Sequence, residues 1–70
     1  MRLPDPGSKV RLTYESGRVV VAEMFYESTA TAGKQSYSVE EDGTFRKLTT
    51  TAGGEVRAIS EVLGRWKREA

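Results

Sequence analysis

The sequence predicts one small α+β domain, an antiparallel β-meander of four strands in two hairpins followed by a C-terminal amphipathic helix. Two similar turns, Glu15-Ser16-Gly17 and Glu41-Asp42-Gly43, stand between runs of apolar and β-branched residues, which is the pattern of a β-hairpin. After Gly54 the apolar residues recur at steps of three and four, as on one face of a helix. The domain covers residues 8–70, and residues 1–7, which hold both prolines, form an irregular N-terminal leader.

The first hairpin covers residues 9–26. Apolar and polar residues alternate along its first strand, so one face is expected to be buried. Gly17 suits a three-residue loop that ends in a bulge, because glycine reaches a positive φ without steric cost. This loop pairs Lys9 with Glu23 and leaves opposite charges across from each other. The expected buried face consists of Val10, Leu12, Tyr14, Val20, Ala22, Met24 and Tyr26.

The second face of this hairpin mixes apolar and basic residues. Val19, Val21 and Phe25 are expected there, beside Lys9 and Arg11. One helix on the other side of the sheet cannot cover them. A sheet with two partly apolar faces needs a layer on each side, so the sequence predicts a homodimer that buries these residues.

The second hairpin covers residues 35–50 and repeats the same kind of glycine turn. Its expected register places Val39 opposite Phe45 and Tyr37 opposite Lys47. Tyr37, Val39 and Phe45 then join the core. Leu48 and Arg46 point to the other side of the sheet.

Two segments that suggest ligand sites are interpreted as a turn and a loop. The acidic residues 40–42 could begin a calcium loop, but such a loop alternates oxygen ligands over about a dozen residues and this cluster ends at Gly43. The small polar segment 27–34 is expected to be a mobile loop. Its Gly33-Lys34 pair lacks the earlier glycine and the following Ser or Thr of a phosphate-binding loop.

The C-terminal segment is expected to be a helix held against the sheet by Trp66. Gly64 argues against a helix, because glycine costs about 1 kcal/mol relative to alanine in a helix interior. The alternative is that a glycine turn sends residues 55–60 back as a fifth strand, which would give a small SH3-like barrel. The apolar stripe of the expected helix consists of Val56, Ile59, Leu63 and Trp66.

The composition argues against several classes of function. The 70 residues include no cysteine and no histidine, so the usual transition-metal ligands and the usual general base near neutral pH are missing. No nucleophile motif is visible, and we expect a protein that is not an enzyme and uses no cofactor. The net charge is only +1, so binding to a polyanion would depend on local clustering of cations. No apolar run approaches the ~18 residues of a membrane span, and a cytoplasmic protein is expected.

A binding module is therefore the expected function, and single-stranded nucleic acid is the first candidate ligand. In this hypothesis Lys9, Arg11 and Arg46 contact phosphates. Phe25 offers an aromatic surface on which a base can stack. The layout of four strands and a helix, with the ladder VRLTYESGRVVV, resembles the single-strand-binding Pur proteins and related coactivators. The resemblance covers strand order and about twelve residues without a diagnostic motif, so it implies no site residue.

The alternative is a protein-interaction module, such as an adaptor, an inhibitor or a subunit. Contiguous apolar surface on so small a domain usually marks a contact with another protein. The expected interface consists of Val19, Val21, Phe25 and Leu48.

Overall fold

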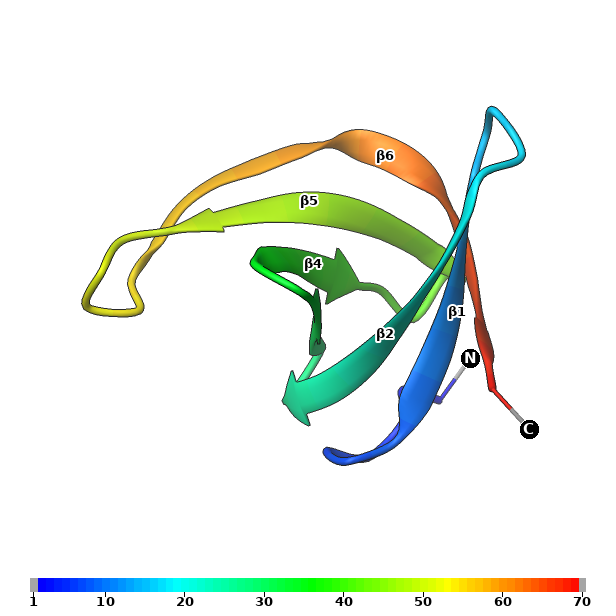
Figure 1. Ribbon diagram of the computed structural model, residues 1–70, viewed down its shortest axis with the longest axis horizontal. Coiled ribbons are helices and arrows are strands. Elements are labelled where there is room, and N and C mark those ends of the chain that lie inside the picture. The colour runs from blue at the N-terminus through cyan, green and yellow to red at the C-terminus, as the bar shows by residue number, and fades with distance from the viewer. Residues whose placement is uncertain (1, 70) are drawn as a thin grey trace.

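The computed structural model describes residues 2–69, and this part of the chain forms six antiparallel β-strands that close into a barrel (Figure 1). Each strand pairs with the next along the chain, and the last strand pairs back with the first. A long hairpin of the last two strands extends to one side of the barrel. The strands are β1 (Lys9–Tyr14), β2 (Val19–Tyr26), β3 (Thr29–Ala32), β4 (Gln35–Val39), β5 (Thr44–Thr50) and β6 (Val56–Arg68).

The predicted α+β class is wrong, because the described residues 2–69 contain no helix and β6 takes the place of the expected C-terminal helix. β6 has 13 residues, and three register shifts interrupt its pairing with β5. One extra residue at Arg57, one at Ser60-Glu61 and one at Leu63 have no separate partner on β5. Each such bulge breaks the two-residue alternation of a strand. The apolar residues of β6 therefore fall three and four apart and imitate the period of a helix.

The SH3-like alternative comes closer to the structure. Residues 55–60 do run back beside the preceding strand, after a turn in which Gly54 has a φ of 87°. The backbone N–H of Thr51 donates to the carbonyl oxygen of Glu55 at 2.8 Å and closes this turn. The barrel nevertheless has six strands, not five.

The extra strand is β3, which lies in the segment expected to be a mobile loop. The connections on its two sides are tight, with Ser28 at a φ of 55° before it and Gly33 at a φ of 63° after it. Ala30 pairs with Met24 on one side and Tyr37 on the other, and it is fully buried. Its small side chain fits between these two larger ones, which explains why a strand of Thr and Ala residues belongs to the core.

The registers predicted for the two hairpins are confirmed. Lys9 pairs with Glu23 in the first, and Val39 pairs with Phe45 in the second. The glycine at the end of each turn has a φ near 90°, 95° at Gly17 and 90° at Gly43. These turn types fix the offset between the two flanking strands.

The core lies inside the barrel. Trp66 is 2% exposed, so its predicted burial is confirmed, although it lies on a strand. Tyr26, expected inside, is 66% exposed, because a bulge between Met24 and Tyr26 shifts the alternation of β2. The buried core cluster consists of Val10, Leu12, Ala22, Met24, Ala30, Tyr37, Val39, Phe45 and Trp66.

The irregular leader, residues 2–8, packs against the barrel. The backbone N–H of Gly7 donates to the carbonyl oxygen of Met24 at 2.6 Å, and that of Met24 donates to Ser8 at 2.8 Å. Leu3 packs against the core, and Pro4 is buried. The leader therefore continues the β1 side of the sheet and covers part of the core.

Gly64 is the residue at which β6 changes partner. Before Gly64 the strand pairs with β5, and from Gly64 onward it also pairs with β1. A Cβ atom at this position would lie 1.9 Å from the carbonyl oxygen of Thr13. Only glycine lets the two backbones approach so closely, so the residue that weakened the helix prediction is required for closing the barrel.

Candidate nucleic-acid interface

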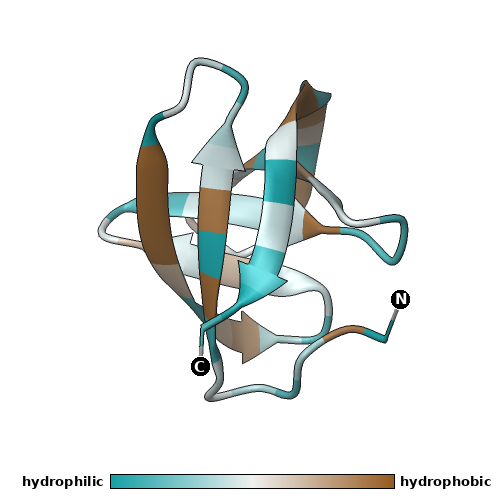
Figure 2. Ribbon diagram, turned by 90° about the vertical axis from the view of Figure 1, so that its right-hand side faces the viewer, coloured by the Kyte–Doolittle hydropathy of each residue, from teal (hydrophilic) through white to brown (hydrophobic). Residues whose placement is uncertain are grey.

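The outer faces of β2, β1 and the C-terminal half of β6 form one surface, seen face on in Figure 2. Arg11 pairs with Val21 on one side and with Lys67 on the other, so these three outward residues lie in one row. Figure 2 shows the hydrophobic start of β2 beside hydrophilic bands on β1 and β6.

The next row of this surface has the same character. Thr13 pairs with Val19 on β2 and with Arg65 on β6. Val19 and Val21 are each 51% exposed, so apolar surface borders the cations along β2. Four exposed cations occupy alternating positions of β1 and of the C-terminal half of β6 on this surface. We call them the basic wall, which consists of Lys9, Arg11, Arg65 and Lys67.

Two carboxylates lie on the same surface. Arg11 holds Glu69 in a two-pronged ion pair, with Nη2 at 2.9 Å from Oε1 and Nε at 3.1 Å from Oε2. Glu23 stands across from Lys9. Four cations against two carboxylates leave the basic wall positive although the whole chain is close to neutral. This is the local clustering that binding to a polyanion requires.

The structure brings together part of the predicted nucleic-acid site. Lys9 and Arg11 are both on the basic wall, and Phe25 follows Glu23 on the outside of β2, where it is 60% exposed. Arg46 lies elsewhere, on β5, with its Nε at 2.7 Å from Glu40 Oε2. β6 separates β5 from β1, so the closure of the barrel carries Arg46 away from the other cations.

Sequence reasoning missed Arg65 and Lys67. In the predicted helix, Arg65 and Lys67 are two positions apart and do not share a face. The prediction therefore does not place them beside Arg11, which lies on a strand. The useful signal is that the two cations flank the buried Trp66, an alternation typical of a half-buried strand.

The residues predicted for a protein interface divide into two places. Val19 and Val21 border the basic wall. Phe25 and Leu48 instead line a cavity of about 330 Å³ between the end of β2 and the tip of the β5–β6 hairpin. Leu48 is only 7% exposed and lies outside the core cluster of the barrel. We call this cavity the apolar groove, and its large apolar side chains are Phe25, Tyr26, Leu48 and Val56.

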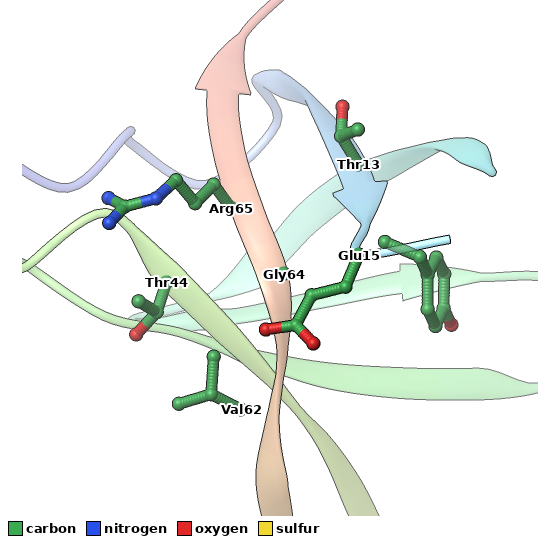
Figure 3. Close-up of a pocket in the computed structure, with 7 residues that line it drawn as sticks. Thr13, Glu15, Thr44, Val62, Gly64 and Arg65 are labelled. Carbon is green, nitrogen blue, oxygen red and sulfur yellow. The ribbon is translucent and has the colours of Figure 1, made fainter. Parts of the chain in front are cut away.

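A second hollow, of about 310 Å³, adjoins the basic wall at Thr13 and Arg65. Figure 3 shows the side chains of Glu15, Thr44 and Val62 around the backbone of Gly64. The hollow lies where β6 crosses β1, and it extends the surface at one end of the basic wall.

Among residues 2–69, two titratable groups have shifted pKa values, one through burial and one through hydrogen bonds. Burial, aided by a hydrogen bond of 2.8 Å between the hydroxyl groups of Tyr37 and Tyr14, raises the pKa of Tyr37 to about 12. The hydroxyl and the backbone N–H of Thr44 both donate to Asp42 Oδ1, at 2.6 and 3.0 Å, and lower the pKa of that carboxyl group. Residues 40–42 therefore belong to a turn, as predicted from the sequence, and these two hydrogen bonds stabilise it.

Within residues 2–69, no three His, Cys, Asp or Glu side chains gather as metal ligands would. The same part of the chain offers no helix with the length and apolarity that a membrane crossing requires. No protein-family model, no curated protein and no solved structure matches this chain. The function is therefore argued from the surface itself.

Proposed function

We propose that the protein is a small non-enzymatic binding module that holds single-stranded nucleic acid across the basic wall. The observation that supports this is the register of β1 between β2 and β6. It sets Arg11 beside Lys67, with the exposed Val21 on the other side of Arg11. Cations next to apolar surface suit a single strand, because its phosphates and its base faces are both accessible.

The cations of the basic wall have free hydrogen-bonding capacity. The Arg11 guanidinium carries five N–H donors, and its ion pair with Glu69 uses two of them. The remaining donors can reach a phosphate while the ion pair persists. Arg65 and Lys67 add donors along β6, and Phe25 is the exposed aromatic residue that follows Glu23, the partner of Lys9, on the outside of β2.

A titration of a labelled single strand of mixed sequence at two salt concentrations tests this proposal. We expect weak binding at low salt that falls steeply as salt rises, because binding releases the counterions condensed on the phosphates. Phe25→Ala should lower the affinity by about 1–3 kcal/mol with little change in the salt dependence if a base stacks on the ring. Absence of binding at low salt by a folded protein would rule the proposal out.

A protein-interaction module is the second candidate, and the apolar groove favours it. Phe25, Tyr26 and Val56 are 60%, 66% and 58% exposed, and they surround the nearly buried Leu48. Such a groove suits an extended segment of a partner protein that inserts an apolar side chain. Binding there should depend little on salt, and Val56→Asp should weaken it. The cytoplasmic location expected from the sequence remains part of both proposals.

A further inference from the structure

The N-terminal half of β6 has an unpaired edge. Residues 64–68 of β6 have a neighbour on each side, with β1 on one side and β5 or the turn before it on the other. In the described part of the chain, residues 56–62 pair only with β5. In Figure 1 this half of β6, coloured yellow-orange to orange, is one of the two strands of the long β5–β6 hairpin. Backbone N–H and C=O groups along such an edge have no partner strand, and an edge of this kind readily accepts another strand.

The side chains along this edge also favour a partner. Val56 is 58% exposed and Ile59 is 55% exposed, and both belong to the large apolar residues that the barrel leaves in contact with solvent. Arg57 and Glu61 are exposed as well. An edge with two exposed aliphatic residues and one charge of each sign is suited to a partner with the complementary pattern.

The edge is complementary to itself. When two copies of residues 56–62 are set antiparallel about Ile59, Arg57 of each copy faces Glu61 of the other. The same arrangement places Val56 opposite Val62, and Ile59 opposite itself on the two-fold axis. Cross-strand pairs of opposite charge and of aliphatic residues are stabilising. In this register neither Arg57 nor Glu61 faces a residue of its own charge.

The bulges of β6 fit the same symmetry. Ala58 and Ile59 pair regularly with Thr49 and Leu48, and the pairing with β5 is irregular at Arg57 on one side and at Ser60-Glu61 on the other. A two-fold axis at Ile59 sets the irregular position Arg57 opposite Glu61, so the irregularities of the two copies largely coincide around a centre at which Ile59 pairs regularly.

We propose that the free edge of β6 binds the same edge of a second copy, giving a two-fold homodimer centred on Ile59. An isologous contact of this kind closes after two copies, so it does not continue into a fibre. The basic wall stays exposed in this dimer, because it is built on β1 and on the half of β6 that is already paired. The interface differs from the one expected from the sequence, which used Val19, Val21 and Phe25.

Charge reversal tests the register. At high micromolar concentration the parent chain should have the mass of a dimer by light scattering, and Arg57→Glu and Glu61→Arg should each shift it towards the monomer. Each single variant places like charges across the axis in both pairs. An equimolar mixture of the two variants should regain the dimer mass, because both pairs across the axis then join opposite charges. A monomeric parent, or a mixture that stays monomeric, would overturn the proposal.

A matched control separates this interface from the basic wall. Arg65→Glu makes the same change of charge on the half of β6 that is paired with β1. It should leave the dimer mass unchanged while weakening nucleic-acid binding. Arg57→Glu should instead dissociate the dimer and leave nucleic-acid binding unchanged. The fluorescence of Trp66, the only tryptophan, reports whether each variant is folded. If Arg65→Glu dissociates a folded dimer, the interface lies on the wall and the β6 edge is not the contact.

Discussion

The indole Nε1 of Trp66 donates a hydrogen bond to the carbonyl oxygen of Glu40, with 2.7 Å between the two atoms. The backbone N–H of Trp66 donates to the carbonyl oxygen of Gly43 at 3.0 Å. One residue of β6 is thus fixed to both ends of the turn between β4 and β5. Because Trp66 also pairs with Leu12 of β1, it joins the two sides of the barrel where the ring closes.

Substitution of Trp66 should separate the contribution of the ring from that of the hydrogen bond. Trp66→Ala should destabilise the fold by ~3–5 kcal/mol, as expected for a buried tryptophan. Trp66→Phe keeps an aromatic ring in the core but leaves the Glu40 carbonyl oxygen without its donor, which should cost ~1–3 kcal/mol. Urea denaturation followed by circular dichroism measures both. A Trp66→Phe variant as stable as the parent would show that the hydrogen bond adds nothing.

Gly64 and Gly53 are the glycines whose φ is not positive. Of the two, Gly64→Ala should destabilise the barrel more. The added Cβ would clash with the carbonyl oxygen of Thr13, a backbone atom that cannot move without parting β1 from β6. We expect a cost at or above the ~1–3 kcal/mol typical of overpacking. Gly53→Ala is the matched control, since a Cβ there would meet only the Thr51 hydroxyl, at 3.8 Å. Equal stability of the two variants would contradict this account of Gly64.

The hairpins could be predicted from the sequence because their registers are local. Gly17 and Gly43 each fix a turn type, and the turn type fixes which residues pair. β6 could not be predicted in the same way. Its pairing with β1 joins residues fifty or more positions apart, and its bulges at Arg57 and Ser60-Glu61 hide the alternation of a strand. The position of Gly64 has meaning only once both neighbouring strands are known.

The same distinction explains the candidate site. Lys9 and Arg11 lie on the first hairpin, and its local register is enough to place them on one outer face. A flat sheet of four strands would put Arg46 on that face as well, which is why the sequence predicts it there. In the closed barrel the neighbour of β1 is β6, so Arg65 and Lys67 occupy the place predicted for Arg46.

Stability should fall at alkaline pH because Tyr37 must stay neutral in the barrel. Its pKa rises from 10.0 to about 12 on folding, so its contribution is complete below pH 10 and is lost as the pH rises towards 12. Urea denaturation across this range should show the loss, and Tyr37→Phe should reduce it. Tyr26→Phe, which removes an exposed hydroxyl group, is the control and should leave the loss in place. An unchanged alkaline loss in Tyr37→Phe would assign it to other groups.

Charge reversal on the basic wall should weaken nucleic-acid binding. Lys67→Glu should cost about 1.5 kcal/mol, roughly tenfold in affinity, if the ammonium group contacts a phosphate. The slope of log affinity against log salt should fall by about 0.7 for each phosphate that the variant no longer neutralises. Lys47→Glu makes the same change of charge on β5, outside the basic wall, and should have a much smaller effect. Equal effects of the two variants would mean that only the net charge matters.

Removal of the Glu69 carboxylate should strengthen nucleic-acid binding. Glu69 holds two N–H groups of Arg11, whose side chain is 52% exposed, and its negative charge lies on the face that the phosphates would approach. An exposed ion pair contributes ~0.2–1 kcal/mol, so Glu69→Gln should lower the dissociation constant by up to about fivefold at low salt, with a smaller gain at high salt.

Glu55→Gln is the matched control for this gain. It removes the same charge from the exposed turn between β5 and β6, away from the basic wall. If Arg11 is a phosphate ligand, Glu69→Gln should tighten binding and Glu55→Gln should not. The gain should also disappear when Glu69→Gln is combined with Arg11→Gln, because the released guanidinium is then absent. A gain over Arg11→Gln that survives in the double variant would show that Glu69 acts through its charge on the surface and not through Arg11.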